Sequence, residues 1–504
     1  MIRSSGVLLN ISSLPGDFGI GDFSEYAREF AKNILEMGFH WWQILPLNKV
    51  GAFNSPYDSA SSYAGNYLYI DPYGLIADGL LSQADVAPYI HTGQPYIVEY
   101  ENVKFNKKQL LRRAFEINID KIPDLIKVFA EKNAYWLDDY ASYMALKRHH
   151  YDAAWFEWDD DIKFKRQPAY GRLLASLSTY ILFFKFEQYL FWKQWGELKA
   201  YVNSLGVNIL GDSPIYVSYD SADVYHNPHY FQLDDALAMK KVAGVPPDYF
   251  SESGQLWNNP LYDFKEMKKD GYYWFRKRIS RLLDIYDSVR IDHFRGFSSY
   301  YAIDKNSATA SGGKWQKGPG TALFKLIKKD YPDAGIIAED LGIIDDKVRG
   351  FLKKTGFPGM RVLQFGFDGG DSENLPHNYI KNSVAYTGTH DNDTLLGWLY
   401  NLNDNVREYV FRYCRFAGND WGKGGKDNLS VKVMIKMLLS SVSALAVVPM
   451  QDICGFGSDT RMNVPGQAEN NWLFRLKKYY MNDIDKRFFA ETNNIYHRNN
   501  ILTE

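Results

Sequence analysis

The sequence predicts one large (β/α)₈ barrel that carries inserted helical and loop-rich segments. Short β-branched stretches alternate with amphipathic helical stretches, eight candidate strands can be counted in the 504 residues, and several of them end in polar residues. An open, doubly wound sheet would show the same alternation. However, no glycine-rich phosphate motif follows the first strand, which disfavours a dinucleotide-binding fold.

The first repeat shows the pattern clearly. A strand-like segment at 6–11 is followed by the amphipathic segment 24–38, in which apolar residues recur at helical spacing, and then by the strand-like segment 41–45. Gly38 is typical of the residue that ends a helix. The same order predicts six further strands, at 207–212, 289–292, 336–339, 361–365, 384–388 and 444–448.

Two stretches exceed what a minimal barrel needs. Residues 73–195 are mostly helix-like and separate the second and third predicted strands. Residues 218–270 are rich in Tyr, Asn, Pro and Asp and separate the third and fourth. We therefore expect residues 1–504 to form a single catalytic barrel, with a largely helical insertion at 73–195 and a loop-rich insertion at 218–270 that covers the active site.

Composition excludes several classes of partner. The chain has 58 Lys and Arg against 60 Asp and Glu and no long basic run, which disfavours nucleic acid or an anionic membrane as the ligand. Two cysteines argue against a disulfide framework and favour a reducing compartment. Because no apolar run is long enough to span a bilayer or to serve as a signal peptide, we expect a soluble, cytoplasmic protein.

Charged and polar side chains gather at the predicted carboxyl ends of strands, which face the active site in barrels of this kind. Carboxylates from the third, fourth, fifth and seventh strands would converge on one pocket. The residues are Asp212, Arg290, Asp292, His293, Glu339, His390 and Asp391.

Two of these carboxyl groups are expected to differ in protonation. Arg290 and Asp292 are two residues apart on a strand and so point to the same side, where the guanidinium would depress the pKa of Asp292 and leave it ionised as a nucleophile. Glu339 follows an apolar run, so desolvation and neighbouring negative charge would raise its pKa and suit it to general-acid catalysis. A pair with separated pKa values is typical of glycosidic chemistry.

Other interpretations of the same residues remain open. An isolated Arg-x-Asp pair is more often a structural ion pair than a catalytic one. Clustered carboxylates also suit a divalent cation, although Arg290, a permanent cation in the same cluster, argues against it. The segment 244–264, with Tyr249, Phe250 and Trp257, is either a packed flap or a lid and platform for a ligand.

Several longer motifs occur along the chain in a specific order and spacing. They are "SSLPGDFGIGDF" (12–23), "NSPYDSASSYAGN" (54–66), "VAGVPPDYFSESGQLWNNPLYDF" (242–264), "VRIDHFRGF" (289–297), "AEDLG" (338–342), "GTHDNDT" (388–394) and "MNVPG" (462–466). Taken together, they resemble those of 4-α-glucanotransferases of the amylomaltase type, glycoside hydrolase family 77. The resemblance runs through most of the chain, but residues 73–195 carry little of it.

The resemblance implies roles for individual residues. Asp292 would be the nucleophile of a retaining double displacement, Glu339 the general acid/base, and Asp391 a third carboxylate that stabilises the transition state through sugar hydroxyls. It implies α-1,4-glucans as substrates, and neither a metal nor a cofactor. Residues matching the family's substrate-binding positions are Tyr57, Asp212, Gln255, Trp257, Arg290, His293 and His390.

The same residues are compatible in part with three alternative functions. An α-amylase-like hydrolase would use the same first half-reaction but let water attack the intermediate. A glucan-binding barrel without catalysis is disfavoured by the presence of Asp292, Glu339 and Asp391. A metal-dependent hydrolase is the remaining alternative.

Overall fold

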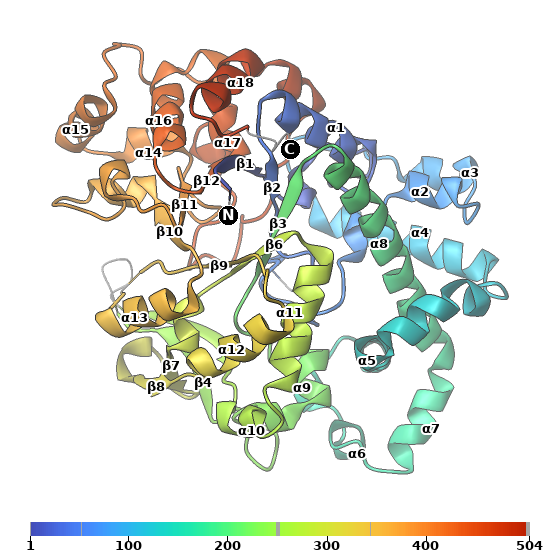
Figure 1. The fold of residues 1–504 in the computed structure, drawn as a ribbon. Coiled ribbons are helices and arrows are strands. Elements are labelled where there is room, and N and C mark those ends of the chain that lie inside the picture. The colour runs from blue at the N-terminus through green and yellow to red at the C-terminus, as the bar shows by residue number, and fades with distance from the viewer. Residues whose placement is uncertain (1, 52, 248–252, 343, 500–504) are drawn as a thin grey trace.

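The computed structural model describes residues 2–51, 53–247, 253–342 and 344–499. Its centre is an eight-stranded parallel sheet in the order β10-β11-β12-β1-β2-β3-β6-β9 (Figure 1). The Ala338 N–H donates to the Pro358 carbonyl at 2.9 Å and links the two edges of this sheet. The strands are β1 (Ser4–Leu8), β2 (Trp41–Gln43), β3 (Asn208–Ser213), β6 (Ser288–Ile291), β9 (Ile336–Ala338), β10 (Gly359–Val362), β11 (Ser383–Tyr386) and β12 (Leu445–Pro449).

The predicted fold class is confirmed, since the sheet forms a nearly closed barrel of eight parallel strands surrounded by helices. Every residue of β1, β6, β11 and β12 is buried, as expected for strands covered on both faces. Two predicted strands, 6–11 and 361–365, end three residues earlier in the structure. The chain leaves β1 at Leu8 and β10 at Val362, and each is followed by a 3₁₀ turn at the barrel mouth.

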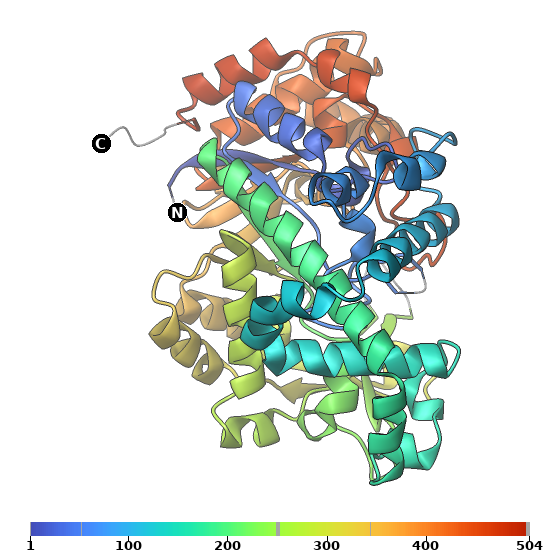
Figure 2. The same cartoon turned by 90° about the vertical axis from the view of Figure 1, so that its right-hand side faces the viewer.

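Most of the helices between β2 and β3 form one layer beside the barrel. The two long ones, α5 and α8, pack against each other and lie on the face turned toward the viewer in Figure 2. The helices of this stretch are α2 (Pro72–Ala77), α3 (Gln83–Val86), α4 (Tyr100–Ile117), α5 (Ile122–His149), α6 (Asp160–Lys163), α7 (Ala169–Ser176) and α8 (Ser178–Ser204).

A second, four-stranded antiparallel sheet in the order β5-β4-β7-β8 was not among the predicted strands. It pairs segments on either side of β6, so sequence periodicity around any one strand does not reveal it. Its strands are β4 (Lys241–Val245), β5 (Gln255–Pro260), β7 (Ser299–Asp304) and β8 (Lys314–Lys317). The helices between β3 and β6 are α9 (Ala222–His226), α10 (Phe264–Lys269) and α11 (Tyr273–Ile285).

The remaining helices complete the barrel's outer ring. Their ends follow local rules, as in α13, where the Asp345 carboxylate accepts the Val348 N–H and Gly356 ends the helix at φ 69°. In the described part of the chain, no helix has the length and apolarity needed to cross a membrane. These helices are α1 (Glu25–Glu36), α12 (Thr321–Asp330), α13 (Asp346–Thr355), α14 (Leu395–Asn401), α15 (Asp404–Cys414), α16 (Leu429–Ser440), α17 (Met450–Ile453) and α18 (Lys486–Ile495).

Arg498, just after α18, closes the end of the barrel at which the strands begin. Its side chain is fully buried and donates hydrogen bonds to four backbone carbonyls, those of Ser4 (2.6 Å), Leu439 (2.5 Å), Ser441 (3.0 Å) and Ser443 (3.3 Å). One guanidinium therefore ties the last helix to the starts of β1 and β12.

Replacing Arg498 tests how much this residue contributes to the stability of the fold. Arg498→Ala leaves buried carbonyls without donors, so we expect the free energy of unfolding to fall by about 3 kcal/mol. Thermal unfolding at a fixed scan rate measures the change as a lower midpoint. Arg487→Ala, at an exposed position of the same helix, is the matched control and is expected to leave the midpoint unchanged. Equal midpoints for the two variants would contradict the assignment.

Candidate active site

A cleft of about 440 Å³ opens at the carboxyl ends of the barrel strands. Seven of the ten predicted site residues line it, namely Tyr57, Gln255, Trp257, Asp292, His293, His390 and Asp391. The other three, Asp212, Arg290 and Glu339, are buried and contact the lining residues from below or from the side. The structure thus brings all ten together, while Tyr249 and Phe250 lie outside the described residues.

The floor of the cleft is a buried ion network. Asp212 and Arg290 are directly paired across β3 and β6, and the guanidinium reaches the Asp212 carboxylate through Nε (3.0 Å) and Nη2 (2.6 Å). The same Nη2 lies 3.1 Å from Asp292 Oδ1. The Tyr57 hydroxyl completes the network by donating to Asp212 Oδ2 at 2.6 Å. Charge-assisted bonds of this kind fix the orientation of each partner.

The pKa of Asp292 differs from the sequence-based expectation. The pKa of Asp292 is raised to about 7, because burial and the Asp212 and Asp391 carboxylates together outweigh the lowering effect of the Arg290 guanidinium. The expected net depression by Arg290 is therefore wrong. One physical reason is that Arg290 lies closer to Asp212 than to Asp292, so its charge is shared between the two carboxylates. The other is that Asp292 lies inside the cleft, where its carboxylate is less hydrated than in bulk water although 34% of the side chain is exposed.

Glu339 behaves as the sequence predicted. Burial raises the pKa of Glu339 to about 8, and the neighbouring Asp292 charge adds to the rise. The carboxylate accepts two backbone N–H groups, from His293 and Leu341, each at 2.6 Å. His293 adopts a left-handed backbone conformation (φ 49°), and its N–H donates to Glu339 from there. Such strain in a residue other than glycine is often found at functional sites.

His390 and Asp391 lie on a loop, 387–395, that begins after β11. Asn463 Nδ2 donates to Asp391 Oδ1 at 2.6 Å, and Arg461 donates to the Asp391 carbonyl at 2.5 Å. His390 Nε2 lies 3.4 Å from the same Oδ1. The sequence-based reasoning missed the roles of Asn463 and Arg461, although Asn463 stands in the motif "MNVPG" that contributed to the family resemblance.

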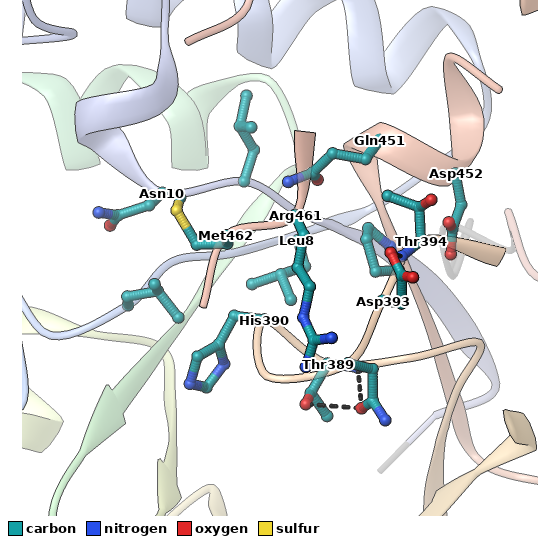
Figure 3. A pocket seen from close by; sticks show the side chains of 14 residues that line it. Leu8, Asn10, Thr389, His390, Asp393, Thr394, Gln451, Asp452, Arg461 and Met462 are labelled. Carbon is teal, nitrogen blue, oxygen red and sulfur yellow. Dashed lines mark hydrogen bonds between the residues drawn. The ribbon is translucent and has the colours of Figure 1, made fainter. Parts of the chain in front are cut away.

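A buried carboxylate, Asp452, holds both ends of this loop. Thr387 Oγ1 donates to Asp452 Oδ2 and the Leu395 N–H donates to Oδ1, each at 2.7 Å. Figure 3 shows Asp452 beside Thr394 at the rear of a small cavity of about 20 Å³, which has room for one water molecule. Asp452 follows the eighth strand, whose end the sequence-based reasoning did not examine for polar residues.

Aromatic rings form the walls of the cleft. Tyr57 and His390 stack at 5.2 Å with 12° between their planes, and Trp472 lies 5.9 Å from each. On the opposite wall, the Trp257 ring meets His293 edge-on at 4.8 Å, and its Nε1 donates to Gln255 Oε1 at 3.0 Å. Trp472 is a further lining residue that the sequence alone did not identify.

His293 lines the cleft and carries a polar ring atom that makes no hydrogen bond within the described residues. Burial and the charge of Arg295 lower the pKa of His293 to about 3, so the ring is neutral. Its Nε2 is buried and has no hydrogen-bond partner among the described residues. The guanidinium of Arg295 packs over the Trp315 ring, 3.9 Å from its centroid. His293 therefore has a free hydrogen-bonding atom at the cleft, whereas Arg295 is engaged with the protein.

The carboxylate cluster does not form a metal site in the described ranges. In those ranges no three His, Cys, Asp or Glu side chains are arranged to hold a metal ion. The carboxylates at the floor are instead joined by Arg290.

Charge coupling between the two central carboxyls can be tested directly. Asp292→Asn removes the negative charge that helps to raise the pKa of Glu339, so we expect that pKa to fall below its value of about 8. Carbon-13 NMR of glutamate carboxyls measures the titration, with Glu339→Gln identifying the resonance. Asp340→Asn is the matched control and is expected to produce a smaller shift, because its charge contributes less. An unchanged Glu339 pKa in Asp292→Asn would show that the two groups are not coupled.

Comparisons with known proteins place this geometry in a family. Residues 9–481 match the family model described as 4-alpha-glucanotransferase. The 4-alpha-glucanotransferase of Aquifex aeolicus is 40% identical over 499 residues, covering 99% of this chain and 100% of the relative. That of Streptococcus pneumoniae is 40% identical over 503 residues, covering 99% and 98%.

A solved structure agrees with the sequence comparisons. The amylomaltase from Streptococcus agalactiae, determined in complex with acarbose, superimposes with a TM-score of 0.94 and 38% sequence identity, covering 99% of this chain and 100% of that one. The family match over most of the chain, the identity of the relatives and the shared fold lead to one conclusion: this chain belongs to the 4-α-glucanotransferase family, glycoside hydrolase family 77.

Proposed function

We propose that this protein transfers a segment of an α-1,4-glucan from a donor to the 4-hydroxyl of an acceptor glucan or glucose, by a retaining double displacement. Family membership supports the transferase activity. The observation that carries the mechanism is the pair of coupled carboxyls directly after the adjacent strands β6 and β9, Asp292 and Glu339, with Glu339 having the higher pKa. The pair has the properties that a nucleophile and a general acid require.

In the first half-reaction, an Asp292 carboxylate oxygen attacks the anomeric carbon of the donor. The bond from that carbon to the glycosidic oxygen breaks, and Glu339 gives its proton to the departing oxygen. The product is a glycosyl ester on Asp292 and a shortened glucan. Arg290 orients the attacking carboxylate through its 3.1 Å contact and remains charged throughout, because Asp212 holds it on the other side.

In the second half-reaction, the 4-hydroxyl of an acceptor attacks the same carbon. Glu339, now ionised, takes the hydroxyl proton, the ester bond breaks, and Asp292 leaves as a carboxylate. Two inversions at one carbon retain the α configuration. Both steps use the same two groups, so the acid of the first step is the base of the second.

Groups around this pair are suited to hold the reacting sugar. Asp391, oriented by Asn463, and His390 present polar atoms to the cleft, and the neutral His293 ring has a free Nε2. We assign these groups to sugar hydroxyls, where hydrogen bonds strengthen as the ring flattens toward an oxocarbenium-like transition state.

The aromatic walls favour transfer over hydrolysis. Water competes with the acceptor for the glycosyl ester, so a transferase must bind the acceptor well and keep water away. Tyr57, Trp257 and Trp472 offer apolar faces that match the faces of pyranose rings. In this proposal Gln255, which accepts the Trp257 N–H, holds one of these rings in place.

Incubation with maltotriose tests the proposed function. Transfer gives glucose together with a ladder of oligosaccharides longer than maltotriose, because each glycosyl ester is passed to another sugar. Chromatography of the products over time measures the distribution. Asp292→Asn is expected to lower the rate at least about 1,000-fold, since it removes the nucleophile. Products no longer than maltotriose would identify a hydrolase, and full activity in Asp292→Asn would refute the nucleophile assignment.

The proposed protonation states predict a bell-shaped pH dependence. Activity requires an ionised Asp292 and a protonated Glu339, so we expect kcat/KM to fall below pH of about 7, as Asp292 gains a proton, and above about 8, as Glu339 loses its own. Initial rates with maltotriose between pH 5 and 10 (roughly the range that covers both limbs) provide the measurement. A flat profile across both limits would contradict these assignments.

A further inference from the structure

A second pocket, separate from the cleft, lies between the helical layer and the segment before β6. It has a volume of about 150 Å³, and none of its lining residues lines the cleft. Its walls come from α5, α9, α11 and the segment 61–63, and these three helices lie in the lower part of Figure 1. We call it the outer aromatic pocket. Six aromatic side chains line it: Tyr63, Tyr135, Trp136, Tyr230, Tyr273 and Trp274.

The rings differ in exposure in a way that suits a ligand site. Trp136 and Tyr63 are 3% and 8% exposed and lie nearly parallel, with 15° between their planes and 6.2 Å between centroids. Tyr135 meets Tyr63 edge-on at 5.9 Å. Tyr135 and Tyr273 are 46% and 51% exposed. Buried rings therefore form the base of the pocket, and two partly exposed rings stand at its rim.

Polar groups share the pocket with these rings. Tyr63 is 8% exposed and carries a phenol group into the lining of the pocket. Asp223 is 4% exposed, accepts the Ser62 N–H at 2.7 Å, and has a pKa that burial raises to about 6. Asp139 and Asn227 also line the space. The pocket therefore combines aromatic faces with carboxylate, amide and phenol groups.

We propose that the outer aromatic pocket binds one glucosyl unit of a long α-glucan outside the cleft. The proposal rests on the proposed function, since that function brings such chains to the surface. A pyranose ring is apolar on its faces and hydroxylated at its edge, which matches stacked aromatic faces beside carboxylate, amide and phenol groups. The volume is below the roughly 300 Å³ at which pockets for drug-sized ligands begin, so one sugar ring fits better than an oligosaccharide.

The charges around the pocket favour a sugar over another occupant of aromatic sites. A cationic ligand would meet Lys277, whose ammonium lies 5.6 Å from the ring centroids of both Tyr135 and Tyr273 and already occupies the cation position. A purely apolar ligand would cover the Asp139 and Asp223 carboxylates without offering them hydrogen bonds. A neutral, polyhydroxylated ring satisfies these groups and covers the aromatic faces.

Binding at a second site has a consequence that depends on chain length. A glucan long enough to reach both sites is held by the outer aromatic pocket while another part of it enters the cleft, which raises its effective concentration there. Turnover of a trisaccharide in the cleft is not expected to depend on the outer aromatic pocket, since the two sites share no lining residue. The pocket therefore affects long polysaccharides and leaves maltotriose turnover unchanged.

Affinity electrophoresis in gels containing glycogen, paired with the maltotriose assay, tests the proposal. Tyr135→Ala and Tyr273→Ala remove the two rim rings at partly exposed positions. We expect each Ala variant to bind glycogen about three- to tenfold more weakly, as loss of one ring contact implies. Tyr151→Ala, which removes a 96% exposed ring outside the pocket, is the matched control and is expected to keep full retention.

Glycogen binding and maltotriose turnover together distinguish failure of the outer aromatic pocket from failure of the proposed function. Weaker glycogen binding with maltotriose turnover intact supports the outer aromatic pocket. Unchanged glycogen binding in both Ala variants would overturn the outer aromatic pocket as a glucan site and leave the proposed function standing. An equal loss of glycogen binding and maltotriose turnover would also overturn it, because the substitutions would then act on the cleft or the fold. Absence of maltotriose turnover in the unmodified protein would instead refute the proposed function.

Discussion

The active site depends on one buried guanidinium. Arg290 binds Asp212 and contacts Asp292, so a single cation holds two carboxylates at the barrel floor. Burying this many charges is tolerable only because each has a partner, and removing the cation would leave two uncompensated negative charges in a poorly solvated space. The position of Asp292 and its partial charge compensation both follow from this contact.

The protonation of Glu339 follows from the same arrangement. Arg290 contacts Asp212 and Asp292 directly, so its charge lowers the pKa of Glu339 less than burial and the Asp292 charge raise it. Its two backbone hydrogen bonds fix the carboxyl position but do not offset burial. One of them requires the left-handed backbone of His293, which shows that local strain is accepted where it orients the acid.

Segments far apart in the sequence complete the site around this floor. The loop that carries His390 and Asp391 is tied at both ends to Asp452 and held at its centre by Arg461 and Asn463. These contacts join the ends of the seventh and eighth strands. Aromatic side chains then enclose the space above. The barrel supplies a rigid frame, and the loops supply the residues that face the sugar.

The sequence by itself determined the barrel and the residues at its strand ends, because the alternation of strands and helices and the position of a carboxylate after an apolar run are local properties. It also predicted the raised pKa of Glu339. Only the tertiary structure decided the pKa of Asp292, because that value depends on burial and on Asp212, which lies 80 residues earlier in the chain and shares the same guanidinium. The β5-β4-β7-β8 sheet and the roles of Asp452, Asn463 and Trp472 were not predicted, because each depends on partners that are distant in the sequence.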